Sequence, residues 1–311
     1  MITPAPVDGS AGVLNFGSLN IDHVYQVDHV VRPGETLAGK GYEVFAGGKG
    51  ANQSAALALA GAPVRHCGRV GEDGVWLRDG LGELGVDVSG IVVDPTCHTG
   101  HAVIQVESTG GENAIFLYPG TNQQISDAQI ETAFSGYISS RILLLQNEIN
   151  SSPSIIHQAK SRNLQVCLNP APFSTDILQW PLHLVDLLIV NQMEAAGLAV
   201  LPATAPPHDL LDTLCRRWPQ AEILLTLGEA GALFHSHGGR TRVTAVQPGP
   251  VLDTTAAGDT FIGYFLAARI GGLGPEDCLR RAAVAAGICV TRHGARASIP
   301  HRDEVLTLLG E

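Results

Sequence analysis

The chain alternates short apolar runs with longer segments in which apolar residues recur at helical spacing. An apolar run closed by polar or small residues predicts a buried strand, and such runs lie in residues 12–22, 63–71, 141–149, 164–172, 185–195 and 222–231. Helical segments separate several of them, at residues 50–62, 152–163 and 207–218. Apolar strands that alternate with helices indicate a parallel sheet covered on both faces. The pattern predicts a three-layer α/β fold with a mainly parallel central sheet, in which ligands bind at the carboxyl ends of the strands.

Two segments break this alternation. Residues 23–48 and 99–120 alternate polar and apolar side chains around glycine-rich turns, which is typical of antiparallel ribbons. Both interrupt the α/β succession, so we expect them to form one small sheet that lies over the main domain. We further expect a flexible amino-terminal extension at residues 1–12, followed by a single domain at residues 13–311.

Composition narrows the classes of function. Among 311 residues, 19 are Lys or Arg and 30 are Asp or Glu, and this net charge of -11 argues against a nucleic-acid surface and against binding to anionic membranes. The six cysteines include no C-x-x-C pair, so neither a disulfide framework nor a zinc site is expected. The first residues lack the basic and apolar regions of a signal peptide, and no apolar run is long enough to span a bilayer. We therefore expect a soluble, cytoplasmic protein.

The sequence GGKGANQSAALALA, residues 47–60, places glycines directly before a predicted helix. Glycine allows a ligand to approach the backbone closely, and Lys49 and Asn52 fall near the helix start, where polar ligands are favoured. A flexible turn followed by a helix cap fits this segment equally well. A second glycine-rich segment, residues 34–40, has the spacing of a phosphate-binding loop. Gly41 replaces the Ser or Thr of that motif and the segment lies in a ribbon, so we interpret it as a turn.

The strongest local signal is DTTAAGDTFIGYFLAARI, residues 253–270. The chain turns through small residues and then enters an apolar helix. Consecutive amides of Ala256, Ala257 and Gly258 at such a helix start form a nest for an anion, which the helix dipole also favours. Because like charges repel, the Asp259 carboxylate would be a poor ligand for a phosphate bound at this nest. It is better suited to take a proton from a hydroxyl that attacks a phosphoryl group. Helix capping is the alternative role for Asp259. The predicted anion nest and the second carboxylate of this segment, Asp253, favour a catalytic role instead.

Two other strand ends carry weaker signals. In NQMEA, Asn191 and Glu194 are three residues apart, so on one helical turn they share a face and could hold a hydrated Mg²⁺. An ordinary helix start would look the same. Thr226 and Gly228 end another strand with a turn, which by itself defines no function.

Together these motifs resemble the ribokinase family of ATP-dependent sugar and nucleoside kinases, over nearly the whole chain from about residue 13 to about residue 300. GGKGANQ and DTTAAGDTF are highly specific for that family, and GSLNIDHV, PGETLAG, LNPAP and TRHGARASIP extend the match. The resemblance implies transfer of the γ-phosphate of ATP to the 5-hydroxyl of D-ribose, giving ribose 5-phosphate, with Mg²⁺ and K⁺ as cofactors. It also implies that the ribbons, about residues 22–48 and 98–121, form a lid that pairs between the subunits of a homodimer.

The resemblance assigns a role to each matching residue. Asp259 would be the catalytic base, and the amides of Ala256, Ala257 and Gly258 would form the anion hole. The sugar hydroxyls would be bound by Asn20, Asp22, Gly48, Lys49, Asn52 and Glu148. The nucleotide site would comprise Asn191, Thr226, Gly228 and Gly258, with Glu194 acting indirectly on Mg²⁺. The K⁺ site, built mostly from backbone carbonyls, would comprise Asp253, Thr255, Cys289, Arg292, Gly294 and Ser298.

The sequence departs from the family pattern at a few positions. Gln192 and Met193 stand where Glu and Thr are common, and Asn147 replaces a residue that is more often apolar. His101 lies in the lid strand that is expected to cover the sugar. These departures concern the acceptor and not the reaction, so deoxyribose, another pentose, a ketose or a nucleoside are alternative acceptors. A sugar-binding protein without catalysis is a further alternative, which the intact AAGD turn disfavours.

Overall fold

The computed structural model describes residues 12–108, 112–135 and 140–311. The flexible extension expected at residues 1–12 therefore lies outside the described residues, except for Gly12, which begins the first strand. Within the described ranges, no helix is both long enough and apolar enough to cross a membrane.

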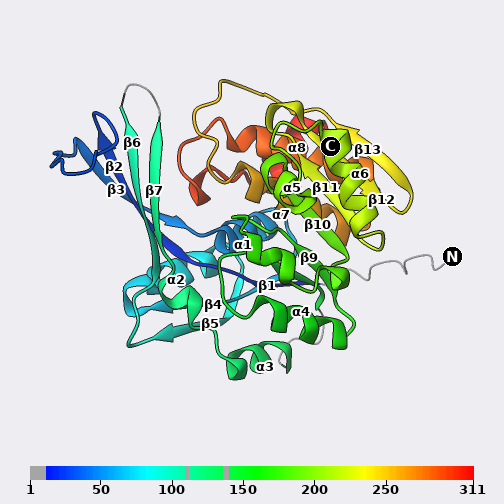
Figure 1. Cartoon of the computed structure of the whole chain (residues 1–311), viewed down its shortest axis with the longest axis horizontal. Helices are drawn as coiled ribbons and strands as arrows, with labels where there is room; N and C mark the ends of the chain where they lie inside the picture. Colours follow the sequence, from blue (N-terminus) through cyan, green and yellow to red (C-terminus); the bar gives the residue numbers. More distant parts are fainter. Residues whose placement is uncertain (1–11, 109–111, 136–139) are drawn as a thin grey trace.

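A nine-stranded sheet forms the middle layer of the molecule (Figure 1). Its order is β13-β12-β11-β10-β9-β8-β1-β4-β5, with every pair from β11 to β5 parallel and with β12 and β13 as an antiparallel edge. The strands are β1 (Gly12–Phe16), β4 (Val64–Gly71), β5 (Asp87–Asp94), β8 (Ser140–Leu145), β9 (Gln165–Leu168), β10 (Leu187–Asn191), β11 (Glu222–Thr226), β12 (Ala232–Ser236) and β13 (Gly239–Val243). The predicted α/β fold with a mainly parallel sheet is confirmed, and the antiparallel edge is an addition to it.

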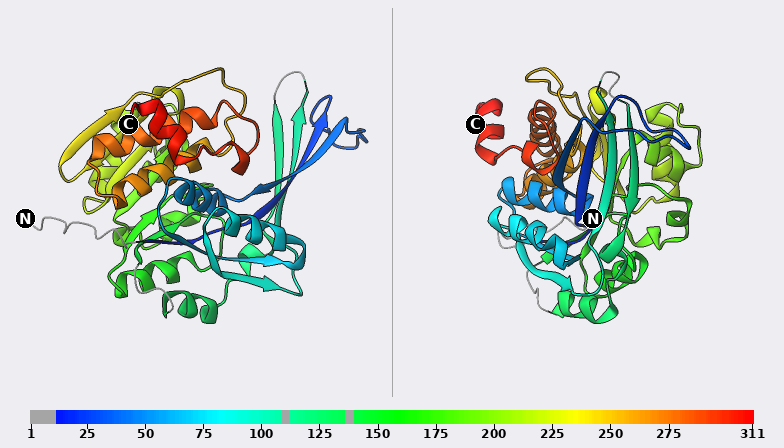
Figure 2. Two further views of the ribbon diagram at one scale, coloured as in Figure 1. Left: turned by 180° about the vertical axis from the view of Figure 1, so that it is seen from behind. Right: turned by 90° about the vertical axis from the view of Figure 1, so that its left-hand side faces the viewer.

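Helices cover both faces of this sheet (Figures 1 and 2). One face carries α1 (Lys49–Leu59), α2 (Val75–Glu83), α7 (Ala257–Ile270), α8 (Pro275–Cys289) and α9 (Arg302–Leu309). The other carries α3 (Asp127–Ser135), α4 (Ser152–Ser161), α5 (Gln192–Ala199) and α6 (Pro207–Arg217). Alternate strand residues enter opposite cores, for example Leu144 the first and Leu145 the second. This two-sided burial explains why the strands are apolar throughout.

A second sheet of four strands stands away from the central one (Figures 1 and 2). Its order is β3 (Gly41–Gly47), β2 (Asn20–Val27), β6 (Gly100–Glu107) and β7 (Asn113–Tyr118). β2 pairs antiparallel with β3, and β6 with β7, as expected for two ribbons. The ribbons join through β2 and β6, which run parallel. Residues 34–40, which have the spacing of a phosphate-binding loop, lie in the connection between β2 and β3.

Candidate active site

The two glycine-rich motifs are brought together by α1 and α7, which lie side by side. Asn52 of α1 contacts Asp259 of α7, and one turn further on a Cβ added to Gly263 would lie 2.4 Å from the Cβ of Ala56. The helices therefore run in the same direction, and a side chain at position 263 would push them apart. Because both amino termini point the same way, the positive ends of two helix dipoles converge on this place.

Asp259 is the buried carboxylate at the centre of the site, with 8% of its surface exposed. Its Oδ2 accepts a hydrogen bond from Asn52 Nδ2 at 3.1 Å, and its Oδ1 accepts one from Gln53 Nε2 at 2.9 Å. Burial raises the pKa of Asp259 above its usual value, and Lys49 and the two amides oppose that rise. The carboxylate is thus held in one orientation and made more basic, which are the two properties that a general base needs.

Lys49 is the cation shared by four carboxylates. The charge of Asp259 is the main reason that the pKa of Lys49 is raised; burial opposes this, and Glu148, Glu194 and Asp22 raise it further. The Glu148 Oε2 atom accepts from the Lys49 backbone amide at 2.9 Å and from the Ser18 hydroxyl. Lys49 therefore remains charged and reduces the repulsion among these carboxylates.

Asp22 extends this cluster into the second sheet, on β2. Burial and the charge of Glu148 raise the pKa of Asp22 to about 7, against the opposing charges of Arg296 and Lys49. Burial in turn lowers the pKa of Arg296 to about 10. A carboxyl group poised near neutrality can accept or donate a hydrogen bond, which suits a partner that carries hydroxyl groups.

Gly48 provides the close backbone approach that the sequence suggested. It has φ 93°, and a Cβ there would lie 2.8 Å from the Ser18 carbonyl oxygen. Gly85 has a similar φ of 89° but open space around its Cβ position.

We expect Gly48→Ala to lower the free energy of unfolding by about 1–3 kcal/mol more than Gly85→Ala does, because strain is common to both and the clash is not. Urea denaturation of the two variants measures the difference. Equal losses would show that the backbone around Ser18 relaxes freely.

The turn before α7 has the geometry of an anion site. Ala256 adopts φ 60° and α7 begins at Ala257, so the first amides of the helix lie beyond a left-handed residue. Gly258 is exposed, with no atom within 4 Å of its Cβ position. The Ala257 amide also reaches the Thr254 carbonyl oxygen at 3.3 Å. An anion here would have to compete with that weak contact for the Ala257 amide.

The residues expected at the cation site lie beside this turn. The two oxygens of Asp253 accept from the amides of Thr255 and Gly294, each at 2.9 Å, and these bonds outweigh burial and lower the pKa of Asp253. The Cys289 Sγ atom lies 3.1 Å from the Ser298 hydroxyl and 3.7 Å from the Thr255 carbonyl oxygen. The guanidinium of Arg292 points elsewhere and pairs with Glu304. Only the backbone of Arg292 is therefore suited to such a site.

Asn191 and Glu194 form a capping box at the start of α5. The Asn191 Oδ1 atom accepts from the Glu194 amide at 2.9 Å, and Glu194 accepts from the Asn191 amide and side chain at 2.9 and 2.8 Å. Burial raises the pKa of Glu194. Because these oxygens already have partners, the pair fits a metal held through water better than a directly bound one. Thr226 lies beside Asn191 on β11, and Gly228 follows it with φ 57°.

Three other residues named from the sequence are Asn20, Asn147 and His101, and each lies in a different environment. Asn20 is buried, and its Oδ1 accepts from Asn122 at 2.7 Å. The Asn147 side chain turns to the Pro172 carbonyl at 2.7 Å. His101 pairs in register with Ile21, which places it on the opposite face of the sheet from Asp22. Neither Asn147 nor His101 therefore faces the carboxylate cluster.

The structure adds buried polar residues to which the sequence analysis gave no role. Gln53 contacts Asp259 directly, and Asn169 links Gln53 to Glu194 through bonds of 3.1 and 3.5 Å. Asn15 and Gln146 continue the network beneath them. A signal was present: Gln53 ends the GGKGANQ motif, and Asn15 and Gln146 interrupt or end apolar strands.

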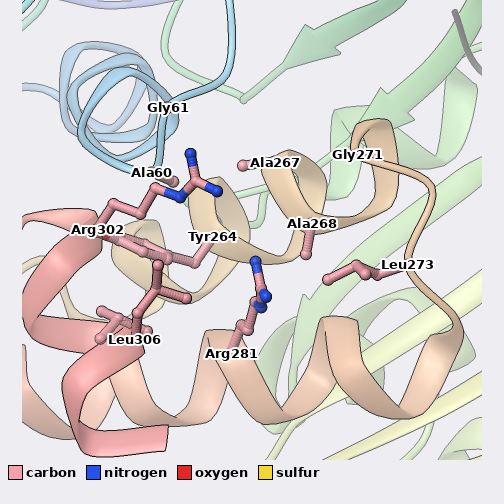
Figure 3. Close-up of a pocket in the computed structure, with 11 residues that line it drawn as sticks. Ala60, Gly61, Tyr264, Ala267, Ala268, Gly271, Leu273, Arg281, Arg302 and Leu306 are labelled. Atoms are coloured by element: carbon pink, nitrogen blue, oxygen red, sulfur yellow. The ribbon is translucent and has the colours of Figure 1, made fainter. Parts of the chain in front are cut away.

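A cavity of about 310 Å³ lies at the far ends of the same two helices (Figure 3). It is bordered by Gly61, Tyr264 and Leu306, with Arg281 and Arg302 beside it, and none of the residues around Asp259 contributes to it. This cavity is not the candidate site, which instead lies where the amino termini of α1 and α7 meet the carboxyl ends of the strands.

The fold and the site define a carbohydrate kinase: the chain belongs to the pfkB family of carbohydrate kinases, whose sequence profile matches residues 10–302. Within that family, the chain is similar to ribokinases. The ribokinase of Haemophilus influenzae is 34% identical over 310 residues, covering 94% of this chain and 96% of that protein. The ribokinase of Arabidopsis thaliana is 34% identical over 306 residues, covering 94% of this chain and 79% of that protein.

Solved structures agree with this assignment. The Arabidopsis thaliana ribokinase complexed with ribose and ATP has a TM-score of 0.85 at 30% identity, with 97% of this chain and 99% of that chain covered. The ribokinase of Cryptococcus neoformans in complex with ADP has a TM-score of 0.84 at 33% identity, with 96% and 99% covered.

Proposed function

We propose that this protein transfers the γ-phosphate of ATP to the 5-hydroxyl of D-ribose, giving ADP and ribose 5-phosphate. The observation that carries the proposal is the buried Asp259, fixed by two amides beside Lys49 and directly behind the amides that begin α7. Similarity to ribokinases, one of them solved with ribose and ATP, supports the choice of substrates.

In the proposed reaction, Asp259 takes the proton of the acceptor hydroxyl as that oxygen attacks the γ-phosphorus. The new O–P bond forms while the bond to the β,γ-bridging oxygen breaks, and ADP leaves. The amides of Ala256, Ala257 and Gly258 stabilise the charge on the transferred group. Asn20, Asp22, Gly48, Lys49, Asn52 and Glu148 hold the sugar hydroxyls.

We assign the nucleotide to the carboxyl ends of β10 and β11, where Asn191, Thr226, Gly228 and Gly258 surround it. The saturated capping box of Asn191 and Glu194 fits Mg²⁺ held through water. Mg²⁺ held there would supply positive charge to the phosphates.

We assign K⁺ to the loop formed by Asp253, Thr255, Cys289, Arg292, Gly294 and Ser298. The loop offers oxygen donors, namely the Asp253 carboxylate, the Thr255 carbonyl and the Ser298 hydroxyl, and oxygen ligands suit a hard cation. A cation held there would support the turn that carries the anion hole.

The experiment that tests the proposal is an assay of ADP release from ATP and Mg²⁺ with D-ribose, 2-deoxyribose, fructose or adenosine, each in K⁺ and in Na⁺. We expect the highest kcat/KM on ribose, and higher turnover in K⁺. Turnover on a different acceptor would retain the chemistry and replace the substrate. Equal rates in K⁺ and in Na⁺ would contradict the assignment of K⁺. No turnover on any of these acceptors would contradict the proposed kinase activity.

We also propose that the protein acts as a homodimer through the second sheet, as a lid. This sheet exposes large apolar side chains, among them Tyr42 at 53% and Phe116 at 70%, and contiguous exposed apolar surface marks interaction sites. The six cysteines, all with free thiols, fit a reducing compartment, and we propose the cytoplasm.

The dimer predicts a different result for apolar residues inside and outside the lid. Phe116→Asp should convert a dimer into a monomer in sedimentation velocity, because a charge would be buried in the interface. Leu308→Asp, at a residue 48% exposed on α9, should leave the dimer intact. A monomeric wild-type protein, or equal effects of both changes, would refute dimerisation through the lid.

A further inference from the structure

Gln53 has no assigned role, yet it is completely buried and contacts the base. Its Nε2 atom donates to Asp259 Oδ1 at 2.9 Å and to Asn169 Oδ1 at 3.1 Å, while its Oε1 accepts from Gln146 Nε2 at 2.6 Å. Both amide protons are thus in use. An amide can present either its nitrogen or its oxygen to a neighbour, and only the nitrogen can bind a carboxylate. The question is what fixes the nitrogen toward Asp259.

The orientation begins at a backbone carbonyl. His66 is buried, and burial lowers its pKa to about 3, so its ring is neutral near pH 7. The Nε2 atom lies 3.1 Å from the Gly17 carbonyl oxygen, which has no proton to give, so Nε2 carries the ring proton. The Nδ1 atom must then accept, and the Ser54 hydroxyl at 2.9 Å must donate to it.

The same reasoning extends from Ser54 to Gln53. Having donated its proton, Ser54 Oγ accepts from Asn15 Nδ2 at 2.8 Å. The Asn15 Oδ1 atom therefore faces Gln146 Nε2 at 3.1 Å, and the same nitrogen donates to Gln53 Oε1. The amide of Gln53 is left with its nitrogen toward Asp259. A flip would place two nitrogens face to face and would set an oxygen against the carboxylate.

We propose that Gln53 is the positioning residue for the base: oriented by this buried chain, it holds Oδ1 of Asp259 and leaves Oδ2, beside Asn52, to face the acceptor hydroxyl. The proposal rests on the function proposed above and adds to it a residue that does not touch the substrate. The second amide proton of Gln53 is donated to Asn169, which in turn donates to Glu194. Gln53 thus also connects the base to the part of the site that contains Glu194.

Gln53 also affects the charge state of the base. The charged and titratable groups around Asp259 are Lys49, Glu148, Glu194 and the thiol of Cys289. Burial raises the pKa of Asp259, and the Gln53 amide is one of the groups that lower it. Removing this donor raises the pKa of Asp259, so the base ionises at higher pH and the acid limb of the rate profile moves upward.

Gln53→Met tests the proposal, since methionine matches the length of glutamine and donates no hydrogen bond. We expect kcat to fall by about 10–100-fold, as for the loss of a hydrogen bond to a charged group. The KM for ribose should change by less than about threefold, because Gln53 acts on the base and not on the sugar. The acid limb of kcat against pH should shift to higher pH.

A purely structural role would give a different pattern. It would lower Tm and reduce the active fraction equally at every pH, without moving the acid limb. Gln129→Met is the matched control, since the Gln129 amide donates to the Gly68 carbonyl at 2.7 Å and is not among the groups around Asp259. If Gln53→Met does not fold, Gln53→Asn decides: it keeps a buried amide but is one methylene shorter, so it loses the contact with Asp259, and kcat and the acid limb should move in the same directions. A folded variant with an unmoved acid limb overturns the proposal.

A substrate-free measurement separates this inference from the function. We would follow the ¹³C carboxyl resonance of Asp259, assigned with Asp259→Asn, through a pH titration of the wild type and of Gln53→Met. A higher pKa in the variant supports the role of Gln53 even if ribose is not the acceptor. An unchanged pKa, with ribose turned over normally by the wild type, leaves the function standing and refutes the positioning role.

Discussion

Asp259→Asn should reduce kcat by about 10²–10⁴-fold, the range that a general base contributes. Asparagine has nearly the shape of aspartate but cannot take a proton from the acceptor hydroxyl. The sugar-binding groups Asn20, Asp22 and Glu148 are untouched, so calorimetry should show ribose binding close to that of the wild type. Steady-state assays of ADP release give kcat, and comparison of the two measurements separates chemistry from binding.

The control for this variant is Asp277→Asn. Asp277 lies in the first turn of α8, as Asp259 does in α7, but it is exposed and is not among the carboxylates that raise the pKa of Lys49. It reproduces the loss of a helix-terminal charge without the loss of the base, so activity should stay near the wild-type level. If Asp259→Asn retained near-normal turnover, a different group would be the base and the motif would have only a capping role.

The fold could be predicted because its main signals are local. Strands such as β8 and β10 are buried on both faces, so they appear in the sequence as continuous apolar runs. The antiparallel edge was not predicted, because β13 contains two arginines and an exposed surface that resemble a loop. The parallel pairing of β2 with β6 was also not predicted, since partners 80 positions apart leave no trace in the sequence of either ribbon.

The residues of the site likewise fall into those that the sequence identifies and those that only the structure connects. Residues in the glycine-rich motifs could be assigned because their neighbours in sequence are their neighbours in space. Gln53, Gln146 and Asn15 belong to one network only because α1, the residue that follows β8, and β1 are packed together. His101 shows the opposite limit: its strand was correctly identified, but only the register with Ile21 reveals that its side chain lies on the far face of the sheet.

Lys49→Met should be the most disruptive change in the cluster. The four carboxylates Asp259, Glu148, Glu194 and Asp22 would lose their shared cation, and breaking a buried pair by removing one partner leaves an uncompensated charge. We expect kcat/KM for ribose to fall by about 10²-fold or more, from lost sugar contacts and a poorly ionised base. The pKa of Asp259 rises further without Lys49, so the acid limb of the rate profile should shift to higher pH.

Stability gives a second, substrate-free readout of the same cluster. Carboxyl groups whose native pKa lies above the unfolded value of about 4 bind protons more tightly in the native state, so stability falls as pH rises from that value through the native pKa. Asp22, with a pKa of about 7, already extends this window to neutrality. Removing Lys49 raises the pKa values of these carboxyl groups further. Between about pH 5 and pH 8, Tm should therefore fall more steeply in Lys49→Met than in the wild type.

Lys160→Met is the control, because Lys160 also pairs with a carboxylate, Asp186 at 2.9 Å, but belongs to α4 on the opposite face of the sheet. It should leave the acid limb in place and should not steepen the dependence of Tm on pH. A Lys49→Met protein whose Tm and rate vary with pH as in the wild type would show that the four carboxylates do not depend on Lys49. In that case the lysine would act only through contacts with the bound substrates, and the charge balance of the empty site would have another origin.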